Sequence, residues 1–582
     1  MFDTYAPPLT AIRASLDRVL RRGPLHELPG FGHADLETMT GVLAEFGRFC
    51  AEVIAPLNRS GDAVGASYDP GSGRVTTPPG WREAYAQYVR AGWGSVPFRP
   101  EFGGGGFPWL LAVAMQEILA SANMAFSLCP MLTQGAVEML TTHGSPQQQG
   151  LYLSKLVTGE WTATMNLTEP QAGSDVGALT TRARPVEDGS WRVSGHKIFI
   201  TYGEHDLAEN IVHLVLARAP GAPAGSRGIS VFIVPQFLPA ADGSPGERNA
   251  VRCTGIEHKM GIHAAPTCSL EFDDAIGFLI GELNTGMRVM FTMMNNARLS
   301  VGLEGLGVAE RAYQAAVRYA RERVQGRPVG QPGDAPIVEH PDVRRMLLHI
   351  RAHIDAMRAL AYTNGWAIDQ AHAATSEQGR RRGQELADLL TPASKAWCTD
   401  LGSELTRLAT QVHGGAGYIT DTGVEQHERD VRIAAIYEGT NGIQAIDLVS
   451  RKLPLRDGAA IGDLFDMIDV TAARLTGELA DLGSSLTAAL GALRAATDWL
   501  LARHGAGPAA VLAAATPYLR QYATVLGGWL LAEQALTPTG PADLAAARYY
   551  GEQVLPLAAA LLPAVTAGAE VLYDLSVESF ER

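Results

Sequence analysis

The spacing of apolar residues changes twice along the chain. Residues 43–53, 110–119 and 343–360 repeat apolar side chains every three or four positions, which places them on one face of a helix. Between these blocks lie short apolar runs bounded by Gly, Pro, Asp or Asn, which are typical of strands in a small β domain. The runs are residues 191–201, 211–217, 229–234 and 268–272. The pattern predicts a mainly α protein with a central β domain.

After residue 454 the chain becomes rich in Ala and Leu. Leucines recur there at spacings of three and four, a stripe that favours antiparallel helix packing. The stripe consists of Leu475, Leu479, Leu482, Leu486, Leu490 and Leu493. The stretches 62–81 and 239–245 are rich in turn-forming residues and are predicted to be loops.

These changes predict four domains. They are an N-terminal helical domain (1–160), a central β domain (161–280), a C-terminal helical domain (281–454) and an additional helical domain (455–582).

Composition narrows the possible functions. The chain has 582 residues and a formal net charge of -14, so it lacks the clustered positive field that nucleic acids require. Its 5 cysteines stand far apart without a CxxC pair, which favours reduced thiols in the cytoplasm.

We expect no signal peptide and no membrane span. Residues 554–569 are apolar, but Pro556 and Pro563 interrupt them, so we expect a buried helix with kinks.

The segment from Met165 to Asp175 offers more chemistry than its surroundings. Pro170 forbids strand continuation, and Gly173 permits a close approach of the backbone to another group. The hydroxyls of Thr168 and Ser174, together with nearby amides, could hold a phosphate. Composition alone would still favour a structural polar loop.

Four segments together resemble sequence motifs of the acyl-CoA dehydrogenase family. They are residues 165–175 (MNLTEPQAGSD), 195–201 (GHKIFIT), 411–418 (QVHGGAGY) and 436–444 (IYEGTNGIQ). The resemblance covers roughly residues 40–452. It implies a helical domain, a small β-barrel-like domain and a four-helix bundle. The additional C-terminal helices look like the longer bacterial subgroup, which includes enzymes for 3-methylthiopropanoyl-CoA and for fatty acyl-CoA.

The resemblance also implies a reaction. Such an enzyme removes a proton from Cα of an acyl-CoA thioester and passes the β-hydride to N5 of FAD. Glu438 matches the catalytic base, and Gly439 leaves room for the thioester. Desolvation would raise the pKa of such a glutamate and strengthen it as a base. Without the motif, Glu438 would be read as a helix-capping or surface carboxylate. The implied electron acceptor is an electron-transfer flavoprotein; an oxidase that uses O2 and a non-catalytic scaffold are the alternatives.

Further roles follow from the resemblance, position by position. The residues matching one group of FAD contacts are Met165, Leu167, Thr168, Gly173, Ser174, Phe199 and Thr201. Those matching contacts to the FAD of a neighbouring subunit, or a further cofactor contact, are Arg323, Gln411, Gly415 and Thr440. The substrate-binding positions are Ser174, Arg298 and Gly439. Because the family divides these contacts between subunits, we expect a homodimer or homotetramer.

The sequence departs from the family pattern at three positions. Phe199 replaces a common tryptophan beside the flavin, Gly442 replaces a glutamine near the adenine, and Gly326 replaces a phenylalanine at the subunit contact. None of these changes removes a group that the reaction needs. His258, His263 and His413 have no metal-ligand spacing, so we expect no metal.

Overall fold

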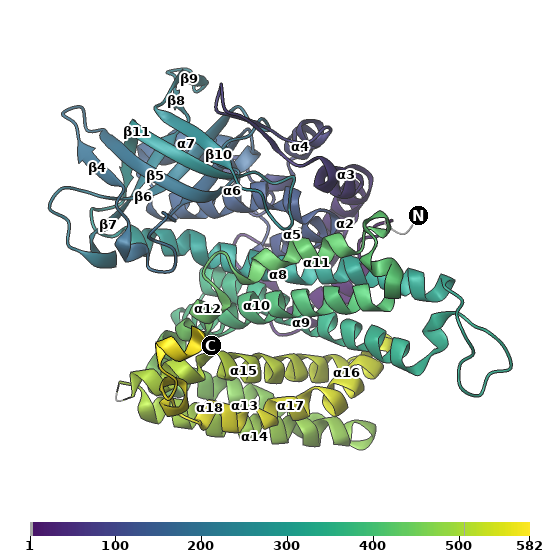
Figure 1. Ribbon diagram of the computed structural model, residues 1–582. Helices are drawn as coiled ribbons and strands as arrows, with labels where there is room; N and C mark the ends of the chain where they lie inside the picture. The colour runs from purple at the N-terminus through teal and green to yellow at the C-terminus, as the bar shows by residue number, and fades with distance from the viewer. Residues whose placement is uncertain (1–3, 506, 582) are drawn as a thin grey trace. The chain divides into compact units, whose positions relative to one another are not determined.

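The computed structural model describes residues 4–505 and 507–581, and its helices and strands follow the predicted order (Figure 1). The chain divides into two compact units: Val42–Ser300, and Met1–Gly41 together with Val301–Arg582. The predicted fold class is confirmed.

The first unit begins with helices. They are α2 (Leu36–Phe49), whose first residues belong to the other unit, α3 (Pro56–Val64), α4 (Trp81–Arg90), α5 (Trp109–Ala122), α6 (Met124–His143) and α7 (Pro146–Thr158). Almost every side chain of α5 is buried, and α5 packs on α6. An all-round apolar helix of this kind belongs in a core. The helix predicted at 110–119 is therefore confirmed.

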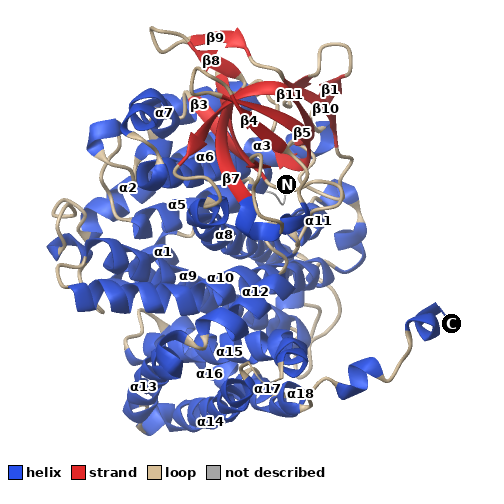
Figure 2. Ribbon diagram, turned by 90° about the vertical axis from the view of Figure 1, so that its left-hand side faces the viewer, coloured by secondary structure: helices blue, strands red, loops and turns tan. Residues whose placement is uncertain are grey.

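The strands of this unit follow. They are β1 (Ser67–Asp69), β2 (Arg74–Thr76), β3 (Trp161–Asn166), β4 (Arg182–Pro185), β5 (Trp191–Thr201), β6 (Asn210–Arg218), β7 (Ile229–Pro235), β8 (Phe237–Pro239), β9 (Pro245–Arg248), β10 (Val251–Ile256) and β11 (Thr267–Ile280). The pairings β11–β5–β4–β6–β7–β11 close on themselves, which makes the sheet barrel-like (Figure 2). β10 extends it beside β11, and β3 runs parallel to β6.

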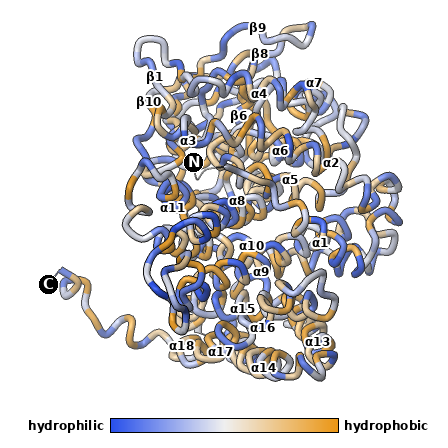
Figure 3. Tube along the Cα trace, turned by 90° about the vertical axis from the view of Figure 1, so that its right-hand side faces the viewer, coloured by the Kyte–Doolittle hydropathy of each residue, from blue (hydrophilic) through white to orange (hydrophobic). Residues whose placement is uncertain are grey.

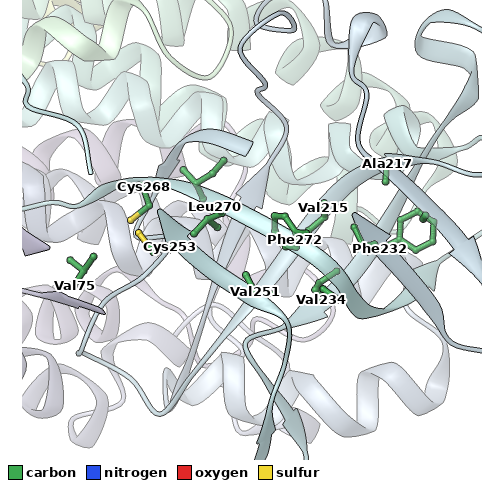
Figure 4. Packing of buried hydrophobic residues seen from close by; sticks show 14 residues of the cluster. Val75, Val215, Ala217, Phe232, Val234, Val251, Cys253, Cys268, Leu270 and Phe272 are labelled. Carbon is green, nitrogen blue, oxygen red and sulfur yellow. The ribbon is translucent and has the colours of Figure 1, made fainter. Parts of the chain in front are cut away.

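Apolar side chains from several strands fill the core of this sheet (Figure 4). The cluster includes Val215, Phe232, Val234, Leu270 and Phe272, all of them buried. The strands that carry them include β7 and β11, which pair although other strands separate them in the sequence. Burial of this apolar surface stabilises the closed sheet.

The second unit is helical. The long helix α8 runs from Gly286 to Glu322, and its first residues belong to the other unit. The remaining helices up to residue 454 are α1 (Leu9–Leu20), α9 (Pro341–Ala373), α10 (Glu377–Val412), α11 (Glu425–Val431) and α12 (Asn441–Asp447). The additional helices are α13 (Ala459–Arg474), α14 (Ala480–Arg503), α15 (Pro508–Leu536), α16 (Pro541–Gln553), α17 (Leu555–Ala560) and α18 (Leu562–Thr566). α1 packs on α9, where the indole N–H of Trp366 donates to the carbonyl of Gly23 at 2.9 Å. The start of the chain therefore folds with the C-terminal helices.

The additional helices α13–α18 carry many apolar residues (Figure 3). Leu482, Leu486, Leu490 and Leu493 of the leucine stripe are buried, as the spacing predicted. Arg18 of α1 also forms a partly buried ion pair with Asp543 of α16 at 2.6 Å. Among the described residues, no helix is long and apolar enough to cross a bilayer.

The connecting loop predicted at 239–245 is confirmed, because these residues join the hairpin strands β8 and β9. Two other local predictions were wrong. Residues 62–81 contain the hairpin β1–β2, whose Tyr68 and Val75 face each other in register. The stretch 554–569 forms two short helices rather than one kinked helix. Pro556 and Pro563 occupy the first turns of α17 and α18, where a backbone N–H has no helical partner.

Candidate active site

Glu438 lies in a strained turn between the 3₁₀ turn Arg432–Ala435 and α12. Its φ is 55°, in the left-handed region that side chains with a Cβ avoid, and Gly439 follows with φ 80°. The amide of Gln444 reaches the carbonyls of Glu438 and Gly439 at 3.5 and 3.4 Å. A Cβ at position 439 would lie 3.0 Å from that amide nitrogen. Strained backbone conformations of this kind are enriched at functional sites, and they persist only where the surrounding structure stabilises them.

The residues after Glu438 anchor this turn to α10. The Thr440 hydroxyl caps α12 by accepting from the N–H of Ile443 at 3.3 Å. The side-chain oxygen of Asn441 accepts from the Nζ of Lys395 at 2.8 Å, and its amide donates to Asp400 at 2.7 Å. Thr440 therefore has a structural role in addition to the cofactor contact predicted for it.

Tyr437 anchors the other side of the turn to α8. Its hydroxyl donates to the carboxylate of Glu304, which is 0% exposed. Burial raises the pKa of Glu304 to about 8, and the nearby charge of Glu438 contributes, although the hydrogen bond from Tyr437 and the charge of Lys395 oppose the shift. Sequence reasoning missed Glu304. It could have been noticed as the one charged residue within the mainly apolar segment 299–309, where a carboxylate is unusual.

The first flavin motif is organised around the buried carboxylate of Glu169. The backbone of Glu169 pairs with that of Ala172, which closes a tight turn after β3. Its side chain accepts from the backbone N–H of Thr180 at 2.7 Å and that of Thr181 at 3.1 Å. The same carboxylate accepts from Nζ of Lys197 at 2.8 Å. These bonds fix the loop that carries Thr168 and Ser174.

Lys197 links the first two motifs. Besides Glu169, its Nζ donates to the carbonyl of Leu167 at 2.9 Å, and both charged side chains are fully buried. Burial alone would raise the pKa of Glu169, but Lys197 and the surrounding donors outweigh it and hold that pKa well below its usual value. Sequence reasoning did not single out either residue. The sequence does show that Glu169 lies inside the first matched motif and Lys197 inside the second, which could have drawn attention to them.

The predicted flavin contacts of these two motifs lie together. The N–H of Ile198 donates to the carbonyl of Thr168 at 3.0 Å, so the first motif touches β5 directly. Phe199 is 57% exposed and has φ 59°, an unusual combination for a large apolar residue. Gly173 and Ser174 are exposed, and Met165, Leu167 and Thr201 are half-buried. An exposed aromatic ring beside hydroxyls and open backbone fits a flavin.

The second group of predicted cofactor residues lies in the helical unit. Arg323 follows the end of α8 and is exposed, and so are Gln411 and Gly415 at the end of α10. The ring of Tyr319 stacks on that of His413 with centroids 4.6 Å apart, which joins the two helix ends. An exposed arginine beside an exposed amide and a glycine fits a pyrophosphate and adenosine.

Arg298 differs from the other predicted site residues because it is only 3% exposed. Its guanidinium donates to Asn295 at 3.3 Å and lies 5.8 Å from the ring centroid of Phe291. Its contact with CoA stays a prediction. Within residues 4–505 and 507–581, no group of three or more His, Cys, Asp or Glu could hold a metal ion.

Comparison with known proteins identifies the class. Sequence models of four domains match the chain: the acyl-CoA dehydrogenase N-terminal domain (37–160), middle domain (164–275) and C-terminal domain (284–453), and the acetyl-CoA dehydrogenase C-terminal-like domain (464–576). The chain belongs to the acyl-CoA dehydrogenase family. It is an oxidoreductase with FAD as its cofactor, as the resemblance implied.

Two relatives are similar over nearly their whole length. The 3-methylmercaptopropionyl-CoA dehydrogenase of Ruegeria pomeroyi is 45% identical, over 95% of this chain and 96% of the relative. The broad-specificity linear acyl-CoA dehydrogenase FadE5 of Mycobacterium tuberculosis is 34% identical, over 95% and 94%. This supports the predicted placement in the longer subgroup.

A solved structure shares the fold over the same length. Caenorhabditis elegans ACDH-11 in complex with C11-CoA has a TM-score of 0.78 at 21% identity, covering 93% of this chain and 90% of that one. The Bacillus anthracis acyl-CoA dehydrogenase complexed with FAD has a TM-score of 0.74 at 20% identity, covering 95% and 91%.

Proposed function

We propose that the protein oxidises the Cα–Cβ bond of an acyl-CoA thioester and that Glu438 removes the α-proton. The observation that carries this proposal is the backbone of Glu438, held at φ 55° by contacts on both sides of its turn. A glutamate used only for solubility needs no such conformation. The strain is consistent with a carboxylate that must be aimed.

The residues of the chain would divide the work as follows. FAD, when bound, supplies the acceptor for the β-hydride. Glu438 takes the α-proton, and its own backbone N–H donates to the thioester oxygen, where negative charge develops. Phe199 would cover the flavin ring, and Thr168 and Thr201 would offer hydroxyls to it. Ser174 contacts cofactor and substrate, Gly439 leaves space for the thioester, and Arg298 contributes to the CoA site.

The acyl group and the electron acceptor belong to the same proposal. The relative that is 45% identical is named for a short thioether acyl-CoA, which makes that thioester our first choice of substrate. We propose an electron-transfer flavoprotein as the acceptor. A panel of short, long, branched and thioether acyl-CoAs, read by flavin bleaching, tests the first point. Fast reoxidation of the reduced enzyme in air would identify an oxidase instead.

We further propose a homodimer or homotetramer in which Arg323, Gln411 and Gly415 hold the FAD of a neighbouring subunit. These residues are exposed and lie close in sequence to large exposed apolar side chains. The apolar residues are Val324 (53%), Tyr418 (88%) and Ile419 (53%). Exposed apolar groups of this size favour a protein interface. Sedimentation of the FAD-loaded protein as a monomer would contradict this assignment.

Glu438→Gln provides the test of the base. We expect the variant to bind FAD normally but to reduce it about a thousandfold more slowly with acyl-CoA, because an amide cannot accept the proton. Glu552→Gln, which changes an exposed glutamate of α16, serves as the matched control and should behave as wild type. A rate within tenfold of wild type in Glu438→Gln would refute the assignment. A purified protein that takes up no FAD would point to a scaffold.

A further inference from the structure

Glu304 is a buried carboxyl that the proposed reaction does not use. It lies on α8 between Leu303 and Gly305, and 0% of it is exposed. The backbone of α8 approaches α10 very closely here: a Cβ on Gly305 would lie 2.3 Å from the carbonyl oxygen of Cys398. Such packing fixes the position of Glu304 within the helical unit and leaves its side chain little freedom.

The contacts of Glu304 lead directly to the proposed base. Oε2 of Glu304 accepts the hydroxyl of Tyr437, the residue that precedes Glu438. Oε1 is buried and has no hydrogen-bond partner among the described residues. A buried carboxylate with one oxygen unsatisfied is costly, whereas a neutral carboxylic acid costs much less.

The charged and titratable groups that act on Glu304 come from two elements. Tyr437 and Glu438 belong to the turn before α12, and Lys395 belongs to α10. Lys395 is also bonded to Asn441, on the far side of the same turn. Burial, with a contribution from Glu438, raises the pKa of Glu304 to about 8, while the hydrogen bond from Tyr437 lowers it. Below that pH the proton stays on Glu304.

We propose that Glu304 is a positioning residue for Glu438: it remains a neutral acid, so that Glu438 carries the single negative charge of the pair, and it fixes the strained turn through Tyr437. This inference rests on the proposed role of Glu438. Two nearby carboxyls in unequal environments divide one charge, and the more buried one keeps the proton. A protonated Glu304 therefore places no second negative charge beside Glu438.

The test compares Glu304→Gln and Tyr437→Phe with wild type. The limiting rate of flavin reduction at saturating acyl-CoA is measured from pH 6 to pH 10, a range of roughly two units on either side of the expected ionisation. Wild type should show an inflection near pH 8. Glu304→Gln keeps a neutral hydrogen-bonding group, so its rate at pH 7 should stay within about threefold of wild type and the inflection should vanish.

Tyr437→Phe should have two effects. Loss of the hydroxyl frees the turn and lowers the limiting rate roughly threefold to tenfold, with unchanged FAD content. It also removes the bond that lowers the pKa of Glu304, so the inflection should move to higher pH. Glu533→Gln is the matched control, because burial also raises the pKa of Glu533 on α15. It should leave the inflection in place.

A spectroscopic measurement keeps the proposal independent of activity. At pH 7 the infrared difference spectrum of wild type minus Glu304→Gln should contain the carbonyl band of a protonated carboxylic acid. Absence of this band from the difference spectrum, or an inflection that persists in Glu304→Gln, would overturn the proposal. Full activity in Glu438→Gln would instead remove the assigned base, while the infrared band would still report the state of Glu304.

Discussion

Removal of Lys197 should destabilise the loop that carries the first flavin motif. Lys197 and Glu169 form an ion pair at 2.8 Å in which both side chains are fully buried. Lys197→Met keeps the length of the side chain but removes its charge and its hydrogen bonds to Glu169 and Leu167. Breaking one side of such a pair costs about 3–5 kcal/mol, because the other charge is left buried.

The surroundings of Glu169 place the expected cost near the lower end of that range. Its carboxylate keeps hydrogen bonds from Gln171 and from the backbone and hydroxyl groups of Thr180 and Thr181. We therefore expect about 3 kcal/mol for Lys197→Met. The double variant, with Glu169→Gln as well, carries no buried charge and should cost less than the two single variants together, with a coupling energy of about 3 kcal/mol.

Hydrogen-exchange mass spectrometry of peptides covering β3 and β5 measures the local loss of stability in each variant. A loss of about 3 kcal/mol corresponds to exchange roughly a hundredfold faster. The effect should depend on pH. The folded pKa of Glu169 is depressed, so its stabilisation is present above its unfolded pKa and is lost as the pH falls through the folded value. If the stability losses of the two single variants simply add up to that of the double variant, the coupling energy is zero and the ion-pair reasoning is refuted.

Three further substitutions probe individual contacts in the structure. Gly439→Ala places a Cβ 3.0 Å from the amide of Gln444 at φ 80° and should slow flavin reduction by about tenfold in stopped-flow measurements, with FAD content unchanged. Gly305→Ala forces α8 away from Cys398 and should lower the free energy of unfolding in urea by about 2–3 kcal/mol. Asp543→Asn should cost about 1–2 kcal/mol at pH 7 by thermal unfolding. Burial would raise the pKa of Asp543, but donors around it lower it overall, so this difference should shrink as the pH falls through the folded pKa.

Much of the fold was predictable from local pattern. β5 spans the predicted residues 191–201, and the buried face of α9 includes Met346, Ile350, Ile354 and Met357, which the helical spacing had placed together. The hairpin β1–β2 was not predictable in this way. Its strands are three residues long, and Tyr68 makes its hydrogen bond to Cys253, 185 positions away in the sequence.

The motifs determined the candidate site by resemblance. The structure then showed which members of a motif support the others, since Ile198 and Lys197 bond directly to the loop that carries Thr168. Burial of charged residues cannot be read from the sequence, because a charged residue is exposed by default. Lys197 and Glu169 departed from that default only because each supplied the other with a partner.

The sequence by itself determined the order of helices and strands, the family motifs and the identity of Glu438 as the candidate base. Only the tertiary structure decided how Glu438 is held. Its turn depends on the contact between Tyr437 and Glu304, residues 133 positions apart, and on the bond between Asn441 and Lys395. The periodicity of apolar residues reports contacts within one element, whereas these contacts form only when separate helices pack.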